Sequence, residues 1–203
     1  MMLRLTLFIF VVALLSCKRD KTTATSKIET TPGISSIYAI DILASKSEWT
    51  MNFNGQKIVV AVPLYGGKIS VLDGILAAGD FELSLSDLHL SNQKDTKTPE
   101  IEGYLRDTLV FHTDEFPISR GILTKIERVE NNPTFNYRLN IDLKIANLIR
   151  PIQCAANIQF AGSSITMVCE PITFDLIEWG IKNQRNTRLQ ISMTFRKEVN
   201  LTN

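Results

Sequence analysis

The sequence Arg-Leu-Asn-Ile-Asp-Leu-Lys-Ile-Ala, residues 138–146, decides the fold. Every second residue from Leu139 to Ile145 is apolar, and the residues between them are polar. A period of two is typical of a β-strand with one buried and one exposed face. Residues 152–160 and 165–169 alternate in the same way. Three such strands in succession predict an antiparallel meander, whose apolar face must pack on a second sheet or close into a barrel.

The connection between the second and third strands predicts their register. A two-residue turn at Ala161-Gly162 would place Phe160 opposite Ser163, so that paired positions sum to 323. The apolar positions of the two strands then coincide, which favours this register. It also places Cys154 opposite Cys169.

Length and charge limit the class of protein. The chain has 203 residues, which is enough for one domain with a tail. It carries 22 Lys and Arg residues against 21 Asp and Glu residues. Because nucleic-acid binding usually requires a strong positive balance, we expect no nucleic-acid partner. The sequence predicts no particular oligomeric state.

The first residues have the pattern of an export signal. Arg4 precedes an apolar run from Leu5 to Leu15, which is short for a membrane-spanning helix. The run ends in Leu-Leu-Ser-Cys, which resembles the lipobox of bacterial lipoproteins. This resemblance implies that residues 1–16 are removed and that Cys17 is acylated, which would anchor the protein in the bacterial cell envelope, facing the periplasm or the cell surface. An ordinary cleaved signal and a short membrane anchor are the alternatives.

The domain organisation follows from composition. Residues 17–33 are rich in Lys and Thr and contain few apolar side chains, so we expect a lipidated, flexible tether. The folded domain is expected at residues 34–198, and residues 199–203 form a short tail.

If Cys17 is acylated, two cysteines are left for the domain, Cys154 and Cys169. They face each other in the predicted register, and an exported protein meets conditions in which disulfides persist. They are therefore disulfide candidates. Two buried free thiols are the alternative, because cysteine is among the most frequently buried residues.

The rest of the chain adds more strands and one helix. Asn54-Gly55 and Asp73-Gly74 predict hairpin turns. Apolar residues at four-residue steps, with a proline at the start, predict a short helix from Pro99 that ends before Phe111. Further strands are predicted at residues 37–43, 47–53, 56–64, 68–72, 81–86, 118–129, 172–176 and 189–195, and residues 75–78 are interpreted as a short apolar segment.

A series of short motifs follows a fixed order between Ile37 and Phe195. They are Ser45–Trp49, Gly66-Gly67, Gly79–Phe81, Tyr104-Leu105, Val110-Phe111, Phe116-Pro117, Phe174-Asp175 and Trp179-Gly180. Their order and spacing resemble the YceI-like family of polyisoprenoid-binding, lipocalin-like periplasmic proteins. Two departures stand out. Leu64-Tyr65 occupies the place where family members commonly carry a histidine, and the segment 181–188 before the last strand is short.

The resemblance implies an all-β fold, an antiparallel lipocalin-like barrel of about eight strands with one short helix. It implies a polyisoprenoid or similar long-chain lipid as the ligand. A bound isoprenoid quinone would also fit, and no cofactor is required. The residues expected to line the cavity are Trp49, Phe81, Leu83, Leu105, Phe111, Leu139, Ile141, Leu143, Phe174 and Trp179.

The sequence predicts neither a metal site nor catalytic residues. His89 and His112 stand apart, and no His-x-x-x-His, Cys-x-x-Cys or Gly-x-Ser-x-Gly motif occurs. Asp107, Asp114 and Glu115 are interpreted as surface charges, because nothing in the sequence places them in a shared cleft.

Two functions stay open at this point. A hollow barrel would bind a long lipid, since each buried methylene contributes about 0.8 kcal/mol. Small barrels are also commonly filled by their own side chains, which would make this a membrane-anchored structural or interaction domain without a small ligand.

Overall fold

The computed structural model describes residues 35–91, 96–182 and 184–198. The predicted signal peptide, Cys17, the tether and the tail lie outside these described residues. The described strands are β1 (Ser35–Ile40), β2 (Lys46–Phe53), β3 (Gln56–Ala61), β4 (Leu64–Leu72), β5 (Ile75–Ser84), β6 (His89–Leu90), β7 (Ile118–Arg128), β8 (Tyr137–Ile145), β9 (Leu148–Ala161), β10 (Ser164–Cys169), β11 (Ile172–Phe174) and β12 (Thr187–Lys197). The helices are α1 (Thr98–Arg106) and the short 3₁₀ helix η1 (Leu176–Trp179).

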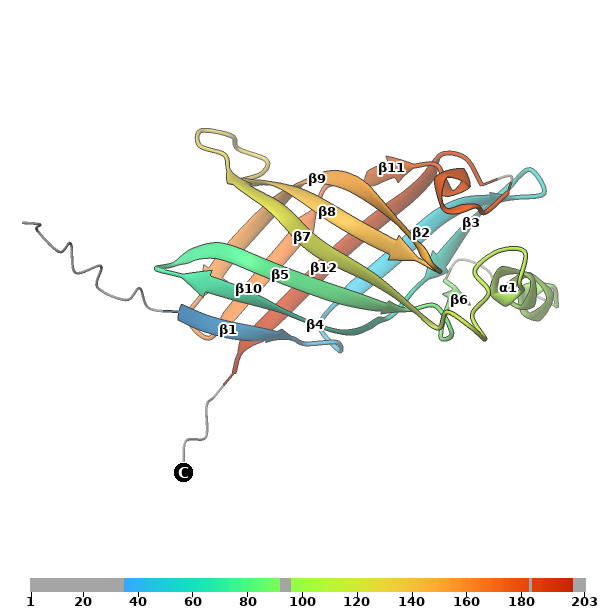
Figure 1. Cartoon of the computed structure of the whole chain (residues 1–203), viewed down its shortest axis with the longest axis horizontal. Coiled ribbons are helices and arrows are strands. Elements are labelled where there is room, and N and C mark those ends of the chain that lie inside the picture. Colours follow the sequence, from blue (N-terminus) through green and yellow to red (C-terminus); the bar gives the residue numbers. More distant parts are fainter. Residues whose placement is uncertain (1–34, 92–95, 183, 199–203) are drawn as a thin grey trace, which may run out of the picture. The chain divides into compact units, whose positions relative to one another are not determined.

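The sheet closes on itself as an antiparallel barrel (Figure 1). Around the wall the order is β1, β4, β5, β7, β8, β9, β10 and β12, and β12 pairs with β1 again. This confirms the predicted all-β barrel of about eight strands with one short α-helix. Strands β2, β3 and β6 extend the wall at one end, which α1 covers; we call it the helix end. The other end carries the β4–β5 and β9–β10 turns; we call it the hairpin end.

The closure depends on the turn between β1 and β2. Strand β12 pairs with β2 through residues 188–192 and with β1 through residues 195–197. Between them, the N–H of Asp41 donates to the carbonyl of Thr194 at 2.7 Å, and the N–H of Thr194 donates to Oγ of Ser45 at 2.9 Å. The guanidinium of Arg196 donates to the Asp41 carboxylate at 2.6 Å, which lowers the pKa of Asp41.

The predicted register between β9 and β10 is wrong by two residues. Ala161 pairs with Ser164, so paired positions sum to 325 and the turn is Gly162-Ser163. Gly162 has a φ of +60°, which glycine adopts without strain; the predicted turn would have placed Ala161 at that position. A shift of two residues keeps every side chain on its predicted face. Cys169 therefore lies opposite Ala156 instead of Cys154.

Two glycine-containing dipeptides, predicted to precede strands, lie inside strands instead. Gly66-Gly67 is part of β4, and Gly79-Asp80 is part of β5, so the predicted segments 75–78 and 81–86 belong largely to one strand. At Gly67 the backbones are so close that a Cβ would lie 2.5 Å from the carbonyl oxygen of Asp80, at a φ of +139°. Glycine here permits a bulge and continued pairing.

The helix α1 ends earlier than its apolar residues predicted. Ile101 and Leu105 are buried, as an amphipathic helix requires. Leu109, the third residue of the predicted stripe, is 74% exposed. The helix ends at Arg106, because the N–H of Asp107 closes the last turn on the carbonyl of Gly103 and the Asp107 carboxylate accepts the N–H of Leu109 at 3.0 Å.

We predict that Gly121→Ala destabilises the barrel. Gly121 lies opposite Phe81 on the neighbouring strand, and a Cβ at Gly121 would lie 2.3 Å from Cζ of the Phe81 ring. We expect the free energy of unfolding to fall by about 1–3 kcal/mol, measured by urea denaturation. A Cβ at Gly103 on α1 would have no atom within 4 Å, so Gly103→Ala is the control and should be neutral or stabilising. Equal stability of Gly121→Ala and wild type would contradict this packing.

Candidate functional site: the barrel interior

The interior of the barrel is apolar and uncharged. Every strand of the wall sends alternate side chains inward, and these form one hydrophobic core. Among the described residues, no Asp, Glu, Lys or Arg side chain is buried. Because an unpaired charge is costly to bury, such an interior accepts a neutral hydrocarbon and rejects an ion.

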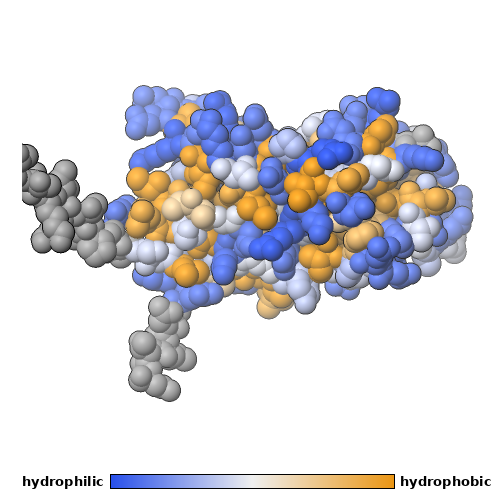
Figure 2. Space-filling model, in the orientation of Figure 1, coloured by the Kyte–Doolittle hydropathy of each residue, from blue (hydrophilic) through white to orange (hydrophobic). Residues whose placement is uncertain are grey.

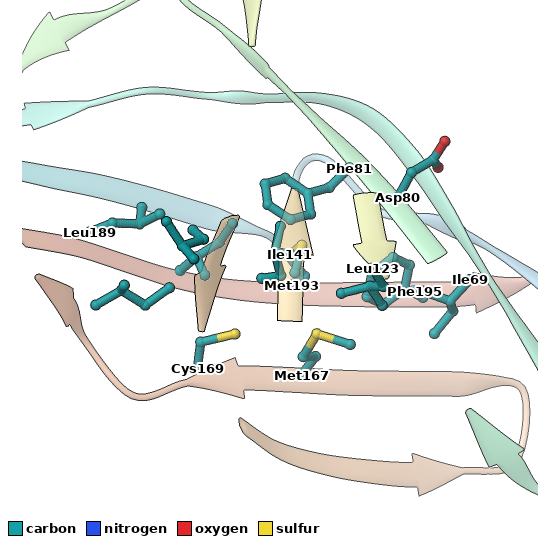
Figure 3. Close-up of a pocket in the computed structure, with 13 residues that line it drawn as sticks. Ile69, Asp80, Phe81, Leu123, Ile141, Met167, Cys169, Leu189, Met193 and Phe195 are labelled. Atoms are coloured by element: carbon teal, nitrogen blue, oxygen red, sulfur yellow. The ribbon is translucent and has the colours of Figure 1, made fainter. Parts of the chain in front are cut away.

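A small cavity lies inside the wall (Figure 3). Its volume is about 10 Å³, which is room for about one water molecule. The side chains of Phe81, Ile141, Met167 and Met193 converge on this space from four strands. The remaining lining residues are Ile69, Asp80, Leu123, Ile152, Cys169, Ile172, Leu189, Ile191 and Phe195.

The residues predicted to line the cavity lie in two regions of the molecule. Phe81 and Ile141 line the internal cavity. Leu83, Leu139 and Leu143 are fully buried on the strands beside it. The other predicted residues lie on β2, α1, β11, η1 and the segment after α1: Trp49, Leu105, Phe111, Phe174 and Trp179.

Aromatic rings pack together at the helix end. The ring centroid of Trp49 lies 5.6 Å from that of Phe111 and 6.0 Å from that of Phe174, and Phe174 lies 5.3 Å from Trp179. All three pairs meet edge to face, the geometry that aromatic quadrupoles prefer. The indole N–H of Trp179 donates to the carbonyl of Leu143 on β8 at 3.0 Å. This cluster therefore connects η1 to the wall.

Four buried polar atoms in this half of the barrel have no hydrogen-bond partner in the structure. They are Oγ of Ser47, Nε1 of Trp49, Oε1 of Gln184 and Oγ1 of Thr187. Trp49 lies opposite Leu189 on β12, and Thr187 lies opposite Phe174, whose ring contacts Trp49. An unsatisfied buried polar atom costs about 1–3 kcal/mol, so these atoms favour a neutral polar group or water beside them.

Two methionines were not predicted as cavity residues. Met167 on β10 and Met193 on β12 are paired across the ladder and both are buried. The alternation 165–169 and 189–195 already placed them on the inward face. Their unbranched, flexible side chains adapt to irregular space, so they are the residues that a ligand would displace most easily.

The two core cysteines lie close together as free thiols. Their sulfur atoms are 3.6 Å apart, and both side chains are buried. The hydrogen bond with Cys154, together with burial, raises the pKa of the Cys169 thiol well above its ordinary value. The disulfide between them stays a prediction.

The described part of the chain has neither a metal-binding cluster nor a membrane-spanning helix. No group of three or more His, Cys, Asp and Glu residues within the described ranges is arranged to hold a metal ion. The helices that the structure describes are too short or too polar to span a bilayer.

The closed eight-stranded wall, its apolar interior and the covering helix define a lipocalin-like barrel. Comparison with solved structures agrees. BcnA of Burkholderia cenocepacia is similar with a TM-score of 0.59 and 10% identity, over 77% of this chain and 98% of that chain. A polyisoprenoid binding domain from Saccharophagus degradans, implicated in plant cell wall breakdown, has a TM-score of 0.57 and 11% identity, over 79% of this chain and 98% of that one.

The YceI protein of Campylobacter jejuni is also similar, at 14% identity and a TM-score of 0.45, over 61% of this chain and 74% of that chain. The chain therefore has the same fold as BcnA and this polyisoprenoid binding domain, a lipocalin-like barrel, as the motifs predicted. No protein-family model matches the sequence, and no curated protein matches it at a significant level.

We predict that the Cys169 thiol makes stability fall at alkaline pH. Its pKa is raised in the folded state, so above about pH 8.5 the unfolded chain releases a proton that the folded chain retains. The free energy of unfolding should then fall by up to about 1.4 kcal/mol per pH unit from this thiol. Urea unfolding under reducing conditions from pH 8 to pH 10, compared with Cys169→Ala, measures the effect. Parallel pH profiles for the two proteins would contradict it.

Proposed function

We propose that this protein binds or carries a polyisoprenoid or a similar long-chain lipid inside its barrel, as an envelope lipoprotein. The observation that carries the proposal is a closed wall around an interior in which no described charged side chain is buried. The fold is similar to that of a polyisoprenoid binding domain, which supports the same class of ligand. We propose no catalytic role.

The bound lipid must open the interior. The cavity of about 10 Å³ has no room for a hydrocarbon chain, so the chain has to displace side chains such as Met167 and Met193. Each methylene that it buries contributes about 0.8 kcal/mol, so a chain of a few dozen carbons offsets the cost of this rearrangement. Ligand size therefore decides affinity more than polar contacts do.

The end group of the lipid is proposed to be neutral. Near the helix end, Ser47, Trp49 and Thr187 supply donor hydrogens and Gln184 supplies an acceptor oxygen, all of them buried without partners in the structure. These groups match a hydroxyl or carbonyl oxygen, as in a polyprenol or an isoprenoid quinone. A phosphate would bring charges for which the described interior has no buried cation.

Native mass spectrometry of protein purified from membranes is the direct test. We expect a co-purified lipid of discrete mass, released by organic solvent. A protein that is always empty and takes up no prenyl alcohol in solution would refute lipid binding.

A second candidate function is favoured by the same cavity. A volume of about 10 Å³ also fits a barrel that is filled by its own side chains and serves as an anchored structural or interaction domain. The position occupied by histidine in family members is Leu64-Tyr65 here, with Leu64 buried and Tyr65 62% exposed. Empty protein in the mass spectrometer supports this function.

We predict that Met167→Phe weakens lipid binding and that Val168→Phe does not. The two residues are neighbours on β10; Met167 lines the cavity, whereas Val168 faces outward and is 45% exposed. A larger ring in the cavity should lower the affinity for a prenyl alcohol by about tenfold, or about 1.4 kcal/mol. Isothermal titration calorimetry measures the affinity, and thermal unfolding checks that both variants fold. Equal affinities would place the ligand elsewhere.

We predict that Cys17→Ala prevents anchoring by acyl chains. If Cys17 carries the acyl chains, the variant should be recovered unprocessed or in the soluble fraction, because several chains together hold a protein at a bilayer. Cell fractionation and intact mass of the wild-type protein test this. Unchanged membrane association, with no acyl mass on the wild type, would refute the lipoprotein assignment.

A further inference from the structure

The wall of the barrel has an unpaired seam between β5 and β7. Their ladder runs from Ser84 opposite Ile118 to Asp80 opposite Ile122 and ends there. Beyond this rung, residues 75–79 of β5 pair with β4, and residues 123–128 of β7 pair with β8. In Figure 1 the two strands diverge toward the hairpin end. Each has a register shift beside the seam, which bends a strand away from its neighbour.

A groove of about 250 Å³ lies on the outer surface at this seam. The small residues Ser70, Ala78 and Gly79 line it, and the apolar side chains of Ile37 and Ile122, 43% and 45% exposed, flank it. Apolar residues are visible among the polar ones on this face of the barrel (Figure 2). Lys68, Ile69, Asp80 and Arg120 complete the lining. The small and aliphatic residues of the groove accommodate a hydrocarbon chain.

The groove and the internal cavity are adjacent. Ile69 and Asp80 line both of them. Between them lies Leu123: a Cβ at Gly79 would be 3.0 Å from Cδ1 of Leu123 and 2.7 Å from Cγ2 of Ile69. Figure 3 shows Leu123 beside Ile69, with the carboxylate of Asp80 pointing away from the cavity. The Leu123 side chain therefore closes the seam from the inside.

Burial along β7 shows that the wall is thin at this point. Leu123 and Ile126 pair with Ile141 and Leu139, whose side chains face the interior and are at most 2% exposed. Leu123 and Ile126 face the same way but are only half-buried. Solvent reaches these two inward-facing side chains because β5 does not cover them.

An ion pair sets the limit of the seam. Arg120 on β7 is the ladder partner of Glu82 on β5, and its side chain lies 3.9 Å from the Glu82 carboxylate. It also forms an ion pair with Asp80, the β5 residue of the last rung. The hydrogen bond to Asp80 raises the pKa of Arg120, so the guanidinium stays charged. The ion pair joins the two strands on the helix-end side of the last rung, and toward the hairpin end the strands do not pair with each other.

We propose that the hydrocarbon chain enters and leaves the barrel sideways through this seam, with the groove as its first binding site and Leu123 as the gate. The two ends are less suitable. Leu105 of α1 and Phe111 are fully buried at the helix end, which they close. One depression at the hairpin end is lined by polar side chains such as Arg128, Glu130 and Asn132, which an apolar chain would have to desolvate. A second depression beside it is lined by residues that do not reach the internal cavity: Ser36, Tyr38, Val71, Asp73, Gly74 and Phe160. The inference rests on the proposed function.

Cys169 provides a test that needs no lipid. It lines the same cavity as Leu123, so its alkylation by N-ethylmaleimide reports passage through the wall. We expect Leu123→Ala to speed alkylation of Cys169 in the full chain by about tenfold, measured by peptide mass mapping, because local opening becomes easier. Leu105→Ala at the helix end is the matched control, and urea unfolding of each variant corrects for global opening. Acceleration by Leu105→Ala alone, or equal rates after this correction, would overturn the seam.

Lipid kinetics then separate this inference from the proposed function. Stopped-flow mixing with a fluorescent farnesyl alcohol should show faster association and faster dissociation for Leu123→Ala than for Leu105→Ala. If the wild type binds the probe but only Leu105→Ala changes the association and dissociation rates, entry through the seam is refuted. The proposed function is then unaffected. A wild-type protein that takes up no probe overturns the proposed function, whereas the alkylation rates still decide whether the seam leads to the cavity.

Discussion

The architecture depends on β12, one edge of which pairs with two strands in succession. Strand β12 pairs with β2 and then with β1, and the turn between Asp41 and Ser45 fills the interval with hydrogen bonds to Thr194. Only three residue pairs join β1 to β12, so these turn contacts and the Arg196 ion pair reinforce a short ladder. Without this closure, the inward faces of all strands would meet water, and no enclosed apolar interior would exist.

Much of this fold was predictable from the sequence, because alternation reports which face of each strand is buried. The residues from Leu139 to Ile145 are buried as that pattern requires, and the hairpin at Asp73-Gly74 forms where it was predicted. Register was less predictable, since a shift of two residues preserves the pattern; only the φ of Gly162 distinguishes the two turns. The strand ends predicted at the glycines of β4 and β5 were wrong, because glycine occurs both at the end of a strand and at a bulge within one.

The candidate site was predictable in part. Phe81 and Ile141 line the cavity, whereas Trp49, Phe111 and Trp179 pack at the helix end. Sequence patterns assign a residue to a face but not to a level along the barrel axis, and this level decides which residues meet. The seam was not predicted, because residues 118–129 were interpreted as one regular strand; the bulge shows only as a three-residue step between the inward-facing Leu123 and Ile126. Its presence follows from bulges on both strands, which make the wall weakest where the interior is already closest to solvent.

The first and last strands of the described chain are neighbours in the barrel wall. Tyr38 of β1 is the ladder partner of Lys197 of β12, so the first and last strands of the barrel meet at the hairpin end. A short peptide could join these strands, and new termini could be opened at an exposed turn such as Asp73-Gly74. The barrel is therefore a natural candidate for circular permutation, and its topology does not require the polypeptide to start with β1.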